Sequence, residues 1–107
     1  MPKRIDWRIV AMMKNQNATQ CVKSVKIINE LGMHARAAAK FVKLASQFKS
    51  AIYVQKGEHN VNGKSIMGIL MLAASMGANI KITAEGADAT DAINALSKLI
   101  EDGFGEK

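Results

Sequence analysis

The chain of 107 residues contains one cysteine, five aromatic residues and no long apolar run. The single cysteine, Cys21, excludes a disulfide within the chain and is typical of a reducing compartment, so we expect a cytoplasmic protein. No stretch reaches the length needed to span a membrane. Residues 1–16 also lack the apolar centre and the small-residue cleavage site of a signal peptide, so we expect no membrane insertion.

Basic charge is concentrated in the middle of the chain. Residues 21–64 carry eight basic and two acidic side chains, whereas residues 65–107 carry three basic and six acidic ones. A basic segment of this kind indicates an anionic partner, which can be a phosphate, an acidic protein face or nucleic acid. Nucleic-acid binding would require exposed aromatic residues among the basic ones, but Phe41 and Phe48 lie on a predicted apolar helical face. We therefore expect no nucleic-acid partner.

Several chemical signatures are missing. The two histidines, His34 and His59, are far apart and are accompanied by neither a cysteine pair nor clustered carboxylates, so we expect no metal site and no cofactor. The sequence contains no recognisable hydrolase triad and no glycine-rich nucleotide loop. These absences argue against a self-sufficient enzyme and favour a protein that binds a group or carries it.

Apolar periodicity predicts an alternation of strands and helices in the order βαββαβα. The expected elements are strand 22–28, helix 35–49, strands 51–57 and 59–63, helix 65–77, strand 78–86 and helix 88–103. This order predicts an α+β domain over residues 21–107, with a mostly antiparallel sheet and the helices on one face. Residues 1–20 are expected to form an arm, either flexible or a short amphipathic helix.

Turn and capping residues set the predicted boundaries. Ser65 and Asp88 are suitable N-caps for the second and third helices, because their side-chain oxygens can accept from free backbone N–H groups. Gly77 and Gly103 are expected to end those helices. A tight turn at 57–58 is expected to join the two central strands.

His34 stands immediately before the predicted helix that begins at Ala35. The first N–H groups of a helix have no internal partner and carry a partial positive charge, which together bind phosphate readily. Arg36 can add a guanidinium, and Gly32 allows a sharp turn before the site. The same positive field favours the neutral, nucleophilic imidazole. From spacing alone, both a phosphoryl-transfer histidine and a simple cap residue remain open.

Two segments carry a resemblance to a known family. They are GMHARAAAKFVKLASQFKSAIYV, from residue 32, and VNGKSIMGILMLAASMGANIKITAEGADATDAINALSKLIEDGFGE, from residue 61. Over residues 22–106 the chain resembles the HPr family, the histidine-containing phosphocarriers of the bacterial phosphoenolpyruvate-dependent phosphotransferase system. The resemblance implies an open-faced β-sandwich, in which a four-stranded antiparallel sheet carries three helices on one face.

The resemblance also implies roles for individual residues. His34 matches the histidine that is phosphorylated at Nδ1 by Enzyme I and that passes the group to EIIA-type domains. Arg36 matches the arginine that steadies the phosphoryl group, and the amides of Ala35 and Arg36 would form the anion cradle. Ser65 matches the serine that HPr kinase/phosphorylase modifies in many bacteria. A carrier of this type is expected to be monomeric.

The segment that follows Ser65 contains more apolar residues than one buried helical stripe requires. Some are expected to pack in the core, and others to form an exposed patch beside His34 that docks partners weakly and quickly. Lysines are expected to surround this patch. The predicted docking residues are Lys40, Lys43, Lys64, Met67, Leu70 and Met71.

The chain departs from the family pattern in three places. Ala37 stands where the family usually has proline, Glu30 lies in a stretch where many members have a small polar residue, and residues 1–20 precede the usual start. Two alternatives stay close to this family: a nitrogen-branch regulatory carrier, and a binding module that acts only through phosphorylated Ser65. A third, an RNA-binding α+β domain, lacks the aromatic residues required for base stacking.

Overall fold

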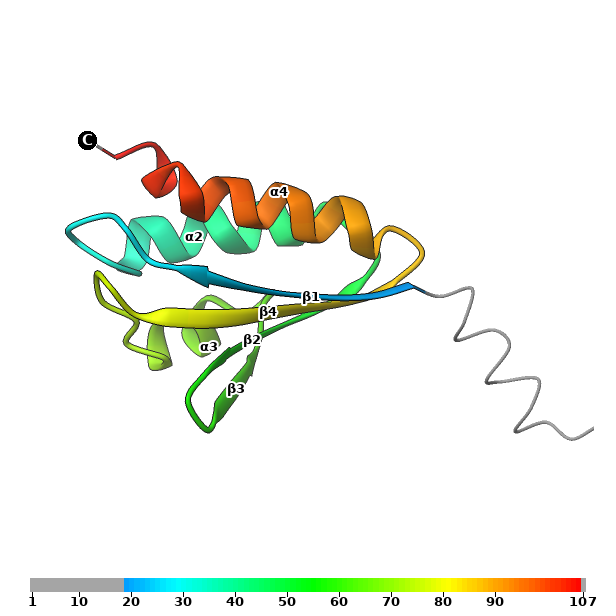
Figure 1. Cartoon of the computed structure of the whole chain (residues 1–107), viewed down its shortest axis with the longest axis horizontal. Coiled ribbons are helices and arrows are strands. Elements are labelled where there is room, and N and C mark those ends of the chain that lie inside the picture. Colours follow the sequence, from blue (N-terminus) through cyan, green and yellow to red (C-terminus); the bar gives the residue numbers. More distant parts are fainter. Residues whose placement is uncertain (1–18, 107) are drawn as a thin grey trace, which may run out of the picture.

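The computed structural model describes residues 19–106 as a sheet packed against helices (Figure 1). The elements are β1 (Thr19–Lys26), α2 (Ala35–Ala45), β2 (Ala51–Lys56), β3 (His59–Asn62), α3 (Ile66–Met71), β4 (Asn79–Gly86), α4 (Ala89–Glu101) and a 3-10 turn, η1 (Gly103–Gly105). This order confirms the predicted βαββαβα arrangement. Thr19 and Gln20, which we expected at the end of the arm, are the first residues of β1; the rest of that arm lies outside the described residues.

The four strands form one antiparallel sheet in the order β1-β4-β2-β3. In the register, Val25 of β1 lies opposite Ile80 of β4, and Ile82 of β4 lies opposite Val54 of β2. All four side chains are buried, because alternate residues of a strand point to the same face. The other face is exposed at positions such as Lys81, so the sheet is open on one side, as the resemblance implied.

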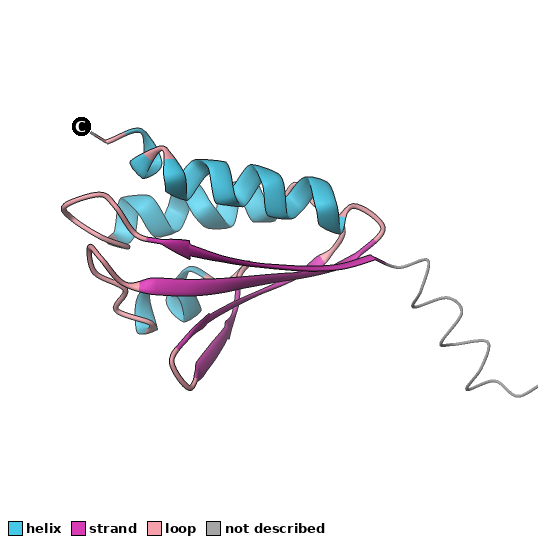
Figure 2. Ribbon diagram, in the orientation of Figure 1, coloured by secondary structure: helices cyan, strands magenta, loops and turns pink. Residues whose placement is uncertain are grey.

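Helices α2 and α4 lie side by side along the sheet, and α3 packs beside α2 near β3 (Figure 2). Phe41 of α2 and Leu96 of α4 are fully buried, as the apolar spacing of each helix predicted. Phe104, in the η1 turn after α4, is also buried and completes the core at the C-terminal end. This last contact ties the segment after α4 to the domain.

Two helices are shorter than their apolar patterns predicted. Helix α3 ends at Met71 rather than near Gly77, and α2 ends at Ala45 rather than at residue 49. After α3, Ala73 adopts a left-handed conformation with φ of 49°, which a helix does not tolerate. The chain then bonds to the loop before α2, where the Met33 N–H donates to the carbonyl of Ala74 at 2.8 Å. This tertiary contact replaces the last predicted turns of the helix.

The predicted cap at Ser65 is confirmed, since its Oγ accepts from the Gly68 N–H at 3.0 Å. Asp88 occupies the N-cap position of α4, but its carboxylate makes no cap bond there. Instead it accepts from the backbone N–H groups of Lys49 and Ser50 at 2.8 and 2.9 Å, and from the Ser50 hydroxyl. The prediction of an Asp88 side-chain cap was therefore wrong, because two free donors between α2 and β2 compete for the same oxygens.

Candidate functional site

His34 is the N-cap residue of α2, as the sequence predicted. Its backbone is extended, with φ of −79° and ψ of 179°, and its Nδ1 accepts from the N–H of Arg36 at 3.2 Å. The side chain is about one quarter exposed, at 27%. The ring is therefore anchored against the first turn of the helix and still accessible from outside.

The other ring nitrogen of His34 meets the C-terminal end of the described chain. Nε2 is in direct hydrogen-bond contact with Oε1 of Glu106, whose side chain is 18% exposed. A backbone N–H can only donate, and an ionised carboxylate can only accept. The two contacts are therefore satisfied together by a ring that carries its proton on Nε2 and a lone pair on Nδ1.

A buried polar residue holds Glu106 against the loop that leads to His34. The Nδ2 group of Asn29 donates to the carbonyl of Gly32 at 2.8 Å and to Oε2 of Glu106 at 3.2 Å. Asn29 is only 6% exposed, so its amide is fixed within the fold. No role was predicted for Asn29 or Glu106 from the sequence, because the contacts of Glu106 with Asn29 and His34 join positions 77 and 72 residues apart.

These contacts act on the charge of Glu106. The hydrogen bond from His34 is the main cause that holds the pKa of Glu106 below its ordinary value of 4.5, and desolvation partly opposes it. The Asn29 hydrogen bond and the nearby charge of Lys40 lower this pKa further. Glu106 is therefore a carboxylate at neutral pH, ready to accept from the imidazole.

The remaining predicted residues around His34 lie where the helix start places them. Ala35 and Arg36 are exposed on the first turn of α2, and the Arg36 amide of the expected anion cradle is engaged by the His34 ring. Ala37 is completely buried, so the methyl group at the family's proline position packs into the core. Glu30 is exposed.

The predicted docking residues fall into two groups. Met67 and Met71 project from α3 and are 69% and 77% exposed, whereas Leu70 is half-buried and packs against the core. Lys43 is exposed on α2. Lys40 and Lys64 each donate to a backbone carbonyl at 2.7 Å, of Phe104 and Phe48 respectively.

The loop before α2 adds an apolar residue that the sequence analysis left out. Leu31 is 72% exposed, three positions before His34. The same loop bonds to the segment after α3 through Met33 and Ala74. Exposed apolar side chains therefore lie on α3 and on the loop that carries His34, and this loop is bonded to the segment that follows α3.

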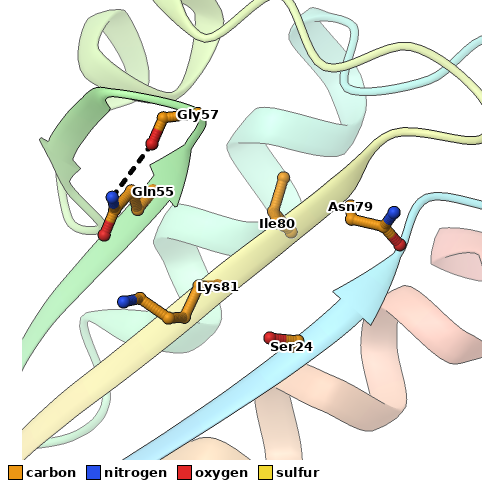
Figure 3. A pocket seen from close by; sticks show the side chains of 6 residues that line it. All are labelled: Ser24, Gln55, Gly57, Asn79, Ile80 and Lys81. Atoms are coloured by element: carbon orange, nitrogen blue, oxygen red, sulfur yellow. Dashed lines mark hydrogen bonds between the residues drawn. The ribbon is translucent and has the colours of Figure 1, made fainter.

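Other features of the described chain do not compete with this site. A shallow hollow of about 230 Å³ lies on the sheet (Figure 3), and neither His34 nor Glu106 lines it. Its lining residues are Ser24, Gln55, Gly57, Asn79, Ile80 and Lys81. Between residues 19 and 106, no three histidine, cysteine or acidic side chains come together as a metal site. No helix in that range has the length and apolar character to cross a membrane.

Comparison with known proteins places this site in a family. The family model described as the PTS HPr component phosphorylation site matches residues 21–102. The phosphocarrier protein HPr of Neisseria meningitidis is 54% identical over 83 residues, which cover 78% of this chain and 93% of that protein. The phosphocarrier protein NPr of Shewanella violacea is 40% identical over 88 residues, which cover 82% of this chain and 97% of that protein.

A solved structure agrees with the sequence relatives. The crystal structure of HPr-C-His from Thermoanaerobacter tengcongensis superposes with a TM-score of 0.79 at 49% sequence identity. The match covers 81% of this chain and 98% of that one. The open sheet and the helix order are therefore those of a known fold at substantial sequence identity.

Proposed function

The chain belongs to the HPr family of phosphocarrier proteins, and from this premise we propose that His34 is the residue that carries the phosphoryl group. The protein is a phosphocarrier of the phosphotransferase system. The nitrogen-branch alternative is not favoured, because an HPr relative is 54% identical and the NPr relative 40% identical. What remains to be assigned is the residue, its partners and its regulation.

One observation carries the assignment to His34: its unprotonated Nδ1 faces the first turn of α2, where its lone pair accepts from the Arg36 N–H, while Nε2 is held by Glu106. A neutral nitrogen with a lone pair is the nucleophile that attack on phosphorus requires. The amides at the start of α2 and the side chain of Arg36 supply donors for the oxygens of the incoming group. His59, in contrast, lies exposed at the start of β3.

The proposed partners are those that the resemblance to the HPr family implies. His34 takes the phosphoryl group from phosphorylated Enzyme I and gives it to EIIA-type domains. The protein acts in the cytoplasm as a monomer. Met67, Met71 and Leu31 form the exposed apolar part of the docking surface, and Lys43 adds positive charge. A small apolar patch with surrounding charge gives fast, weak association, which suits a carrier that must leave each partner quickly.

Ser65 is a candidate for regulation by a serine kinase of the HPr kinase/phosphorylase type. Its hydroxyl caps α3, one residue before Ile66 and two before the exposed Met67. A phosphate at a helix N-terminus is favoured by the helix dipole, so modification need not disrupt α3. The added negative charge would lie at the docking surface.

The experiment that tests the assignment is intact-mass measurement after incubation with phosphoenolpyruvate and purified Enzyme I. The wild type is expected to gain one acid-labile phosphoryl group, and His34→Ala is expected to gain none. His59→Ala is the matched control, since it removes the other histidine and should be phosphorylated like the wild type. A folded wild type that gains no phosphoryl group, or a His34→Ala variant that gains one, would contradict the proposal.

A further inference from the structure

The C-terminal segment brings a carboxylate to the active histidine from the far end of the chain. Oε1 of Glu106 contacts Nε2 of His34, on the side of the ring opposite the Arg36 amide. The acceptor on one side and the donor on the other independently select the same tautomer. The carboxylate thus reinforces the tautomer in which Nδ1 carries no proton.

Glu106 is held in place by its own supports. The side chain of Phe104 is buried in the core, and the Glu106 N–H donates to the carbonyl of Gly103 at 3.0 Å. Asn29 donates to the second carboxylate oxygen from within the fold. A side chain with a buried neighbour two residues away and two fixed hydrogen bonds has little freedom, so the carboxylate is preorganised toward the ring.

We infer that Glu106 is a positioning residue for phosphoryl transfer, which keeps the lone pair of His34 on Nδ1 and offsets the charge of the ring once Nδ1 is bonded to phosphorus. This inference rests on the proposed phosphorylation of His34. It adds a residue from the end of the chain to a site otherwise built from the start of α2. The arrangement follows the general pattern in which a third group orients the nucleophile's ring.

The transfer step shows why a carboxylate is useful at this position. The Nδ1 lone pair forms the N–P bond while the bond between phosphorus and the phosphorylated donor protein breaks, and that electron pair returns to the donor atom. No proton has to leave Nδ1, because it carries none. The proton on Nε2 stays on the ring, which therefore becomes cationic, and the ionised Glu106 lies within hydrogen-bond distance of it.

The reverse step uses the same contact. When an acceptor attacks phosphorus, the N–P bond breaks and its electron pair returns to Nδ1. The cationic ring is a better leaving group than a neutral one, and the Nε2–H bond to Glu106 is kept throughout. Glu106 therefore assists both loading and unloading without touching the phosphoryl group.

Two variants test this role against a matched control. Glu106→Ala removes the acceptor, and Glu106→Gln keeps an oxygen but removes the charge. Glu101→Gln removes a carboxylate from α4 that pairs with Lys23 at 3.1 Å, away from His34. We expect phosphoryl uptake from Enzyme I to be roughly tenfold slower in Glu106→Ala, as for the loss of a charge-assisted hydrogen bond, and intermediate in Glu106→Gln. Glu101→Gln should match the wild type.

A second readout separates positioning from simple structural support and needs no partner protein. The ring-nitrogen NMR shifts of His34, measured at about pH 9 where an ordinary imidazole is neutral, report which nitrogen carries the proton. The wild type should show an unprotonated Nδ1 and a protonated Nε2, and in Glu106→Ala the two signals should move toward each other. His59 provides an internal reference. Ring signals that do not change in Glu106→Ala, or uptake as fast as in the wild type, would overturn the inference.

The two proposals fail in different ways. A wild type that is never phosphorylated on His34 would contradict the proposed function, whatever the ring signals show. A wild type that is phosphorylated normally, with Glu106→Ala equally fast, would leave His34 as the carrier and remove Glu106 from the mechanism.

Discussion

Nζ of Lys40 donates to the backbone carbonyl of Phe104 at 2.7 Å. Lys40 belongs to α2, the helix that begins at His34, and Phe104 lies two residues before Glu106. The bond therefore ties the helix that carries the histidine to the segment that carries its carboxylate partner. A lysine that sequence reasoning placed in a docking surface is engaged in the internal geometry of the site.

Substitution of Lys40 should loosen the C-terminal turn. We expect Lys40→Ala to lower the free energy of unfolding by about 1 kcal/mol, since one hydrogen bond with a charged donor is lost. Hydrogen exchange of the amides of residues 105 and 106 should become faster. Lys43→Ala, on the same helix but exposed, is the control and should change neither quantity. Equal effects of the two substitutions on urea unfolding and on exchange would contradict the anchoring role of Lys40.

The turn before His34 should depend on glycine at position 32. Gly32 has φ of 65°, and an added Cβ would lie 2.8 Å from the Ala74 carbonyl oxygen and 2.9 Å from the Cα of Ser75. Gly57 has a similar φ of 60° with no atom within 4 Å of that position. Gly57→Ala should therefore lower the free energy of unfolding by about 1 kcal/mol, because alanine disfavours the left-handed backbone. Gly32→Ala should lower it by clearly more, because the added Cβ also meets the backbone of Ala74 and Ser75.

Urea denaturation of both glycine variants checks this comparison, and phosphoryl uptake shows whether the site is affected. Gly32→Ala should slow uptake, because backbone must shift beside the loop that carries Met33 and His34. Gly57→Ala should leave uptake unchanged. Equal losses of stability in the two variants would contradict this prediction, since they would show that the backbone at Ala74 and Ser75 moves away from the added Cβ at position 32 without cost.

Charge at Ser65 should slow loading of His34. Ser65→Asp keeps an N-cap oxygen for the Gly68 N–H but adds negative charge next to the exposed Met67. We expect several-fold slower uptake from Enzyme I, with a larger effect at low ionic strength, since screening weakens interactions between exposed charges. Ser65→Asn is a neutral capping control and should behave like the wild type. Equal rates for Ser65→Asp and Ser65→Asn would contradict regulation by charge.

Much of this fold could be predicted because its signals are local. Alternation through Ile80, Ile82 and Ala84 and the helical spacing around Phe41 each determine which face of an element is buried, and the structure agrees. The position of His34 before Ala35 also predicted that it is the N-cap residue of α2, which the structure confirms. Local patterns of this kind need no knowledge of distant contacts.

The wrong predictions have a common physical cause. Helix α3 ends early because Ala74 bonds to the loop at Met33, and Asp88 turns to the donors at Ser50 instead of capping its own helix. Both results depend on groups distant in sequence. Glu106 could not be assigned for the same reason, since nothing near it in the sequence shows that the chain returns to His34.

The stability that Asp88 gives to the junction between α2 and β2 should decrease at acid pH. The hydrogen bond from the Ser50 side chain, followed by that from the Lys49 N–H, holds the pKa of Asp88 below its ordinary value of 3.8. A carboxyl whose pKa is lower in the folded state stabilises the fold above its unfolded-state pKa, and this stabilisation is lost as the pH falls from about 3.8 through the lower folded value.

The substitution Asp88→Asn tests this effect, because it keeps the shape of the side chain and removes its charge. We expect it to lower the free energy of unfolding at pH 7, and we expect the difference from the wild type to shrink at about pH 2.5, which is below the ordinary pKa of 3.8, so that part of this stabilisation is lost. Asp91→Asn removes a charge from the first turn of α4 but leaves the bonds to Ser50 intact, so it controls for a general effect of charge at this helix end. Urea unfolding at both pH values gives the comparison. A loss in Asp88→Asn that is the same at pH 7 and at pH 2.5 would mean that the charge of Asp88 has no special role, and that the loss comes from replacing one accepting oxygen by an NH2 group.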